Sequence, residues 1–106
     1  MEFLNKIELR GVIGNIVVHR VADTEVARFS VATDYAFEQN GCNVIDTTWH
    51  QVTAFKGDQM PDFSELHRGL KVYVTGRLRM QRYIGFDGVE RFAPDVFANE
   101  VKIVEE

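Results

Sequence analysis

The stretch TWHQVTAF, residues 48–55, gives the clearest indication of the fold because its side chains alternate with a period of two. Such alternation predicts a half-buried β-strand, here over Thr48–Lys56. One face suits a barrel core, with the histidine interpreted as a core or interface residue: His50, Val52 and Ala54. The opposite face carries Trp49 and Phe55. Large aromatic side chains outside a core are costly to hydrate unless something covers them, so this face predicts a binding surface or a subunit contact.

Alternation of the same kind predicts strands on both sides of this segment: a first through Ile7, Leu9 and Gly11, a second over Val26–Tyr35, a fourth over Lys71–Tyr83 and a fifth over Arg91–Val104. The polar stretch Glu38–Asp46 and the pair Asp87-Gly88 predict turns. One short helix is predicted over Pro61–Arg68, because proline suits a first helical turn and Gly69 can end it. This order predicts an all-β, five-stranded Greek-key OB-fold barrel, with the helix between strands three and four plugging the open end.

The fourth strand repeats the two-faced arrangement. Its apolar set alternates around Gly76: Val72, Val74, Leu78 and Met80. The other face mixes aromatic and cationic side chains: Tyr73, Thr75, Arg77, Arg79, Gln81 and Tyr83. Aromatics close to arginines suit a platform on which nucleic-acid bases stack while cations hold the phosphates. The alternatives are aromatics buried in a subunit interface, and arginines (Arg77, Arg79, Arg82) that only solvate a strand.

Composition narrows the function classes. The chain has 106 residues, which fits one domain over 1–106. Its net charge of −4 gives no general attraction for nucleic acid, but four arginines against two acids between Arg77 and Arg91 make a locally basic ribbon. The single cysteine, Cys42, excludes an intrachain disulfide and has no partner at metal-ligand spacing. No phosphate loop, metal cluster or nucleophile motif is present, so no enzyme activity, cofactor or metal is expected.

No apolar run is long enough to span a membrane, and the N-terminus lacks the hydrophobic core of a signal peptide. We therefore expect a cytoplasmic protein with no membrane partner.

Four blocks of the sequence together resemble the bacterial single-stranded DNA-binding proteins, in order and spacing, from about Asn5 to Val104: Asn5–Gly11, Ala27–Thr33, Thr48–Phe55 and Gly76–Tyr83. The resemblance implies an OB barrel that assembles as a homotetramer, with a dimer as the weaker alternative, and that wraps DNA around the assembly. It implies sequence-tolerant binding and protection of single-stranded DNA during replication, recombination and repair, in the bacterial nucleoid.

The resemblance also implies roles for individual residues. Four aromatics are implied to stack on bases: Phe37, Trp49, Phe55 and Tyr83. The last three also follow from the alternation, whereas Phe37 rests on the resemblance alone. The cations implied to contact phosphates are Arg79 and Arg82, followed by Arg68 and Lys6. Arg77 and Lys56 are added on charge and placement.

Departures from the family pattern leave two rival functions open. The sequence ends at Glu106 without the flexible tail whose acidic tip recruits replication and repair enzymes, so that recruitment is not expected. A short primosomal-type OB protein, acting as an adaptor for replication restart, is one rival. An OB-fold oligomerisation module without DNA binding is the other.

Overall fold

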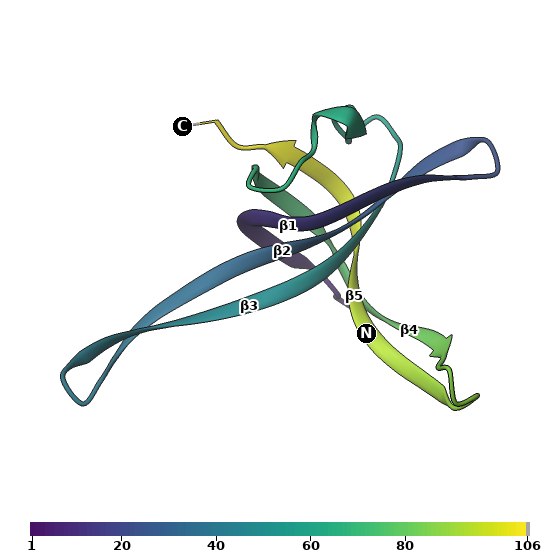
Figure 1. Cartoon of the computed structure of the whole chain (residues 1–106). Coiled ribbons are helices and arrows are strands. Elements are labelled where there is room, and N and C mark those ends of the chain that lie inside the picture. The colour runs from purple at the N-terminus through teal and green to yellow at the C-terminus, as the bar shows by residue number, and fades with distance from the viewer. Residues whose placement is uncertain (106) are drawn as a thin grey trace.

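Five long strands form a closed barrel in the computed structural model, which describes residues 1–105 (Figure 1). Their bounds are β1 Ile7–Val21, β2 Thr24–Gln39, β3 Cys42–Phe55, β4 Lys71–Ile84 and β5 Glu90–Ile103. The order around the barrel is β1-β2-β3-β5-β4, and β4 closes it by pairing antiparallel with β1. The pairing of β3 with β5 is parallel, and the other pairings are antiparallel. The predicted five-stranded OB barrel is confirmed.

The barrel core comes from the inward side chains of all five strands, as the alternation predicts. Fully buried members include Ile13, Phe29, Val52 and Val74. Burying one such side chain contributes about 1.5–3 kcal/mol, so these residues supply much of the force that closes the barrel. His50 is half-buried rather than fully enclosed, and its Nε2 lies 2.9 Å from Thr33 Oγ1.

The predicted helix over Pro61–Arg68 is wrong in type and length. Only Phe63–Glu65 coils, as one 3₁₀ turn. Asp62 caps this turn by accepting a hydrogen bond from the Ser64 N–H at 3.0 Å, and Leu66 already returns to extended backbone. Helix nucleation is unfavourable, so a segment this short stays in a turn unless packing extends it. Phe63 and Leu66 are nevertheless buried in the core cluster, so the segment still contributes to the core.

Three hairpins project from the barrel, and two of them, β2–β3 and β4–β5, bear on the site (Figure 1). The segment Glu38–Asp46, expected to be a turn-rich loop, mostly continues the β2–β3 ladder, which runs unbroken from Val26 opposite Phe55 to Gln39 opposite Cys42. Only the pair Asn40-Gly41 forms the turn, with φ of 52° and 78°. Figure 1 shows this ribbon projecting as a long twisted arm, and the β4–β5 hairpin leaving the barrel in a different direction.

The extension of the β4–β5 hairpin changes the environment of part of the apolar set on β4. Leu78 is 48% exposed and Met80 is 60% exposed, although both continue the alternation of the buried Val72 and Val74. Their inward face has left the barrel, so within one subunit it has no core to cover it. The apolar set of the fourth strand therefore divides into a buried part, Val72 and Val74, and an exposed part, Leu78 and Met80.

Candidate nucleic-acid interface

The outward side chains of β3, β5 and β4 form one continuous surface, which we call the outer face. β5 lies between the other two strands, with Phe97 beside Thr53 of β3 and opposite Arg77 of β4. Residues opposite one another in a ladder point to the same side of the sheet. The outer face therefore contains Trp49, Gln51, Thr53 and Phe55 of β3, Asp95 and Phe97 of β5, and Arg77, Arg79, Gln81 and Tyr83 of β4.

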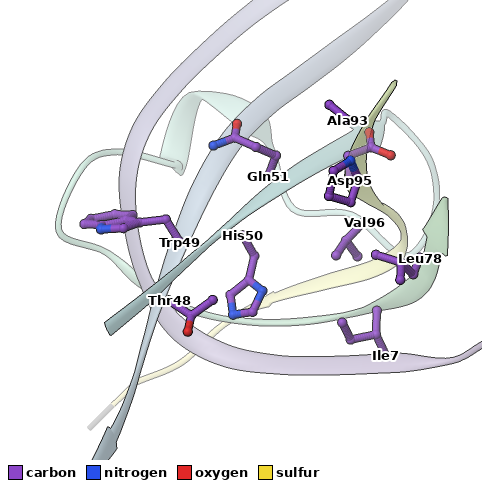
Figure 2. Close-up of a pocket in the computed structure, with 10 residues that line it drawn as sticks. Ile7, Thr48, Trp49, His50, Gln51, Leu78, Ala93, Asp95 and Val96 are labelled. Atoms are coloured by element: carbon purple, nitrogen blue, oxygen red, sulfur yellow. The ribbon is translucent and has the colours of Figure 1, made fainter. Parts of the chain in front are cut away.

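Trp49 lies on the backbone of β1 where Gly14 has no side chain. A Cβ added at Gly14 would collide with the six-membered ring of Trp49, so only glycine lets the ring approach this closely. The indole is still 58% exposed, and Arg68 lines the same hollow. Figure 2 shows the ring projecting away from Leu78 and Val96. This arrangement leaves a fixed aromatic surface open to solvent beside a cation.

Phe55 is stacked on a second ring that the sequence did not predict as functional. Its centroid lies 5.7 Å from that of Phe97, with 16° between the ring planes. Arg79 and Arg77 place their guanidinium carbons 4.4 Å and 5.1 Å from the same Phe97 centroid. Phe55 remains 39% exposed, so part of its ring is available to a further planar partner.

A nearly buried carboxylate lies among these cations. Asp95 is 8% exposed and accepts hydrogen bonds from Arg79 Nε at 2.8 Å, Arg79 Nη2 at 3.2 Å, Thr53 Oγ1 at 2.9 Å and Gln81 Nε2 at 3.3 Å. Burial raises the pKa of Asp95, but the hydrogen bonds from Arg79 and Thr53 lower it by more, so the net pKa lies below the ordinary value of 3.8. Asp95 is therefore a charged structural link between β3, β4 and β5.

The lowered pKa of Asp95 predicts a pH-dependent contribution to stability. A carboxylate with a depressed folded pKa stabilises the fold above its unfolded pKa, and this stabilisation is lost as the pH falls through the folded pKa. Replacing Asp95 by Asn should therefore reduce the free energy of unfolding by about 1–3 kcal/mol near neutral pH. Urea titrations of the wild type and of Asp95→Asn, repeated over a range of pH, measure the difference in their free energies of unfolding. This difference should shrink as the pH falls below about 4. A difference that stays constant with pH would show that the charge of Asp95 is not what stabilises the fold.

The four aromatics implied by the family resemblance do not share one surface. Trp49, Phe55 and Tyr83 belong to the outer face, with Tyr83 opposite Arg91 near the end of the β4–β5 hairpin and 47% exposed. Phe37 lies opposite Val44 on the β2–β3 arm, and the alternation along the ladder places it on the opposite face from Trp49. Its neighbour is Tyr35, with ring centroids 6.1 Å apart.

The predicted phosphate-binding cations differ in their present partners. Three form exposed ion pairs of 3.5–3.8 Å with acids: Lys6 with Glu8, Lys56 with Glu25, and Arg82 with Glu90. Exposed pairs of this kind are worth about 0–1 kcal/mol, so a phosphate can compete for the cation. Among residues 1–105, Arg68 and Arg77 have no carboxylate within ion-pair distance.

A largely apolar hollow lies between β3 and the β4–β5 hairpin, and its lining includes Trp49. Figure 2 shows His50, Ile7, Leu78 and Val96 around it.

Residues 1–105 contain no group of three or more His, Cys, Asp or Glu side chains arranged to hold a metal ion. No helix among these residues is long and apolar enough to span a membrane.

The family model and the relatives that match this chain all describe single-strand binding proteins. Residues 4–104 match the model of the single-strand binding protein family. The chain is 36% identical over 104 residues to the single-stranded DNA-binding protein of Neisseria meningitidis serogroup A, covering 95% of this chain and 60% of that protein. It is 35% identical over 106 residues to the single-stranded DNA-binding protein of Xanthomonas axonopodis pv. citri, covering 95% and 58%. The chain thus spans about 60% of the length of these relatives.

Solved structures share the fold. One described as the Plasmodium falciparum SSB complex with ssDNA superposes with a TM-score of 0.77 at 22% identity, covering 98% of this chain and 96% of that one. The small single-stranded DNA-binding protein from Streptomyces coelicolor gives a TM-score of 0.70 at 19% identity, covering 96% of each chain. The family model spans nearly the whole barrel and the Neisseria relative exceeds a third in identity, so this chain belongs to the single-strand binding protein family.

Proposed function

We propose that this protein binds single-stranded DNA without sequence preference and protects it during replication, recombination and repair. The observation that carries the proposal is the outer face, which combines exposed rings at Trp49, Phe55 and Tyr83 with the guanidinium groups of β4. Aromatic rings accept any base because every base has a π-face, and cations accept any phosphate. The role is non-enzymatic, and its location is the cytoplasm at the bacterial nucleoid.

The mechanism divides between stacking and charge. Bases stack on Trp49, Phe55 and Tyr83. Phe37 stacks on a base where the DNA passes over the other face of the β2–β3 arm. Six cations neutralise phosphates along the path: Lys6, Lys56, Arg68, Arg77, Arg79 and Arg82. Arg79 differs from the others because Asp95 accepts hydrogen bonds from its Nε and Nη2, so a phosphate would meet a guanidinium that is already held in place.

A gel-shift titration tests this function. Labelled oligothymidine should be retarded at submicromolar protein, and unlabelled single strands of any base composition should compete, whereas a duplex of the same length should compete poorly. Base stacking needs unpaired bases. Equal competition by the duplex would therefore show that the protein binds polyanions in general and not single strands. Absence of any shift would leave the oligomerisation module as the better interpretation.

We further propose that the chain assembles as a homotetramer, with a dimer as the weaker alternative. The support is the apolar hollow together with the exposed Leu78 and Met80, which one subunit leaves uncovered. Contiguous apolar surface of this kind marks protein contacts. Light scattering at micromolar concentration should give about four times the 12.2 kDa subunit mass. A stable monomer would exclude both the assembly and the wrapping of DNA around it.

A further inference from the structure

We propose that Phe97 is a positioning residue of the DNA-binding surface: held by Arg79 and Asp95, it supports Phe55 as a base-stacking platform. This inference rests on the proposed function and extends it to a residue that contacts Phe55 from behind. Three linked contacts carry it, from Asp95 to Arg79, from Arg79 to Phe97, and from Phe97 to Phe55.

The position of β5 in the sheet lets Phe97 act between two neighbours. β5 lies between β3 and β4. Phe55 of β3 therefore contacts the Phe97 ring from one side, and the arginines of β4 contact it from the other. The two phenylalanine planes are only 16° apart, which leaves the far face of Phe55 parallel to the supporting ring. A base arriving on that face would extend a stack that is already ordered.

Asp95 and Arg79 keep this stack in place. The guanidinium makes two hydrogen bonds to Asp95, and its side chain is 26% exposed. Asp95 is fixed in turn by Thr53, two residues before Phe55 on β3. A cation over an aromatic face contributes about 0.5–2 kcal/mol, with the larger value for a partly desolvated pair. Pre-ordering Phe55 reduces the entropy lost when a base stacks on it.

A double-mutant cycle tests the inference. Affinities for oligothymidine are measured for the wild type, Phe97→Leu, Phe55→Leu and the double variant at one salt concentration. Leucine keeps apolar volume at the half-buried Phe97 site but removes the flat ring. We expect Phe97→Leu to weaken binding about 3- to 10-fold in the wild-type background, with an unchanged salt dependence, because no phosphate contact is lost. In the Phe55→Leu background the same substitution should have almost no effect.

Each outcome separates the alternatives. An equal loss in both backgrounds would show that Phe97 acts independently of Phe55, and no loss in either would show that the support is irrelevant; both overturn the inference. Phe3→Leu is the control, because Phe3 precedes β1, is 91% exposed and makes no ring contact with the residues of the outer face. This control should leave the affinity for oligothymidine unchanged. Light scattering checks that the mass of the assembly is also unchanged. If the wild type itself fails to bind oligothymidine, the proposed function fails and the inference with it.

Discussion

Raising the salt concentration from 50 to 200 mM is expected to weaken the binding of oligothymidine by roughly 50- to 300-fold. The estimate assumes four to six phosphate contacts, each contributing about −0.7 to the slope of log affinity against log salt on single strands. The protein carries a net charge of −4, so its overall field repels DNA and attraction must come from the local placement of cations. Fluorescence anisotropy of labelled oligothymidine over a salt series measures the slope.

Arg77→Ala identifies one of these contacts. Arg77 has no carboxylate partner among residues 1–105, so its charge is available to a phosphate. The slope should become shallower by about 0.7, with an equal loss for every base composition. Arg20→Ala removes the same charge near the β1–β2 turn, where the alternation along the ladders places the side chain on the opposite side of the sheet from Phe55, and should leave the slope nearly unchanged. A flat salt response of the wild type would make the arginines of β4 an ordinary solvated strand face.

Replacing Trp49 by alanine is expected to weaken binding about 5- to 150-fold, which corresponds to roughly 1–3 kcal/mol for one stacked base. Trp49 is exposed and lies against the backbone at Gly14, so its loss removes a platform rather than a core side chain. Trp49→Phe should lose less, since it keeps a ring at the same place. The affinity of each variant is measured together with its mass and its thermal unfolding.

The mass measurement separates binding from assembly. If Trp49→Ala lost affinity only in step with dissociation into smaller species, Trp49 would be an interface residue and not a stacking platform. A variant that keeps its mass and its melting temperature but loses affinity supports stacking.

The strands and their inward faces were predictable because burial imposes a period of two on the sequence, as in Val52 with Ala54 and Val72 with Val74. What alternation cannot report is where a strand leaves the barrel. Leu78 and Met80 continue the same pattern, but the hairpin that carries them extends past the core. The helix prediction failed for a related reason: Pro61 and Gly69 mark the ends of a segment without showing that its interior is long enough to coil.

The members of the outer face were predictable one strand at a time. Trp49, Phe55 and Tyr83 were found from alternation, since each is a large ring on the outward side. Phe97 obeys the same alternation, but the role we propose for it depends on the parallel pairing of β3 with β5, which places it beside Thr53. Register between strands so distant in sequence is set by closure of the barrel and leaves no local signal.

The most direct test of single-strand binding uses Trp49 as its own reporter, because it is the only tryptophan in the chain. Stacking of a base on the indole should quench its emission as oligothymidine is added. The account predicts strong, saturable quenching at low salt that reverses when salt is added, and little change with a duplex of equal length. Unchanged emission, together with no retarded species in a gel shift of the same mixture, would contradict it.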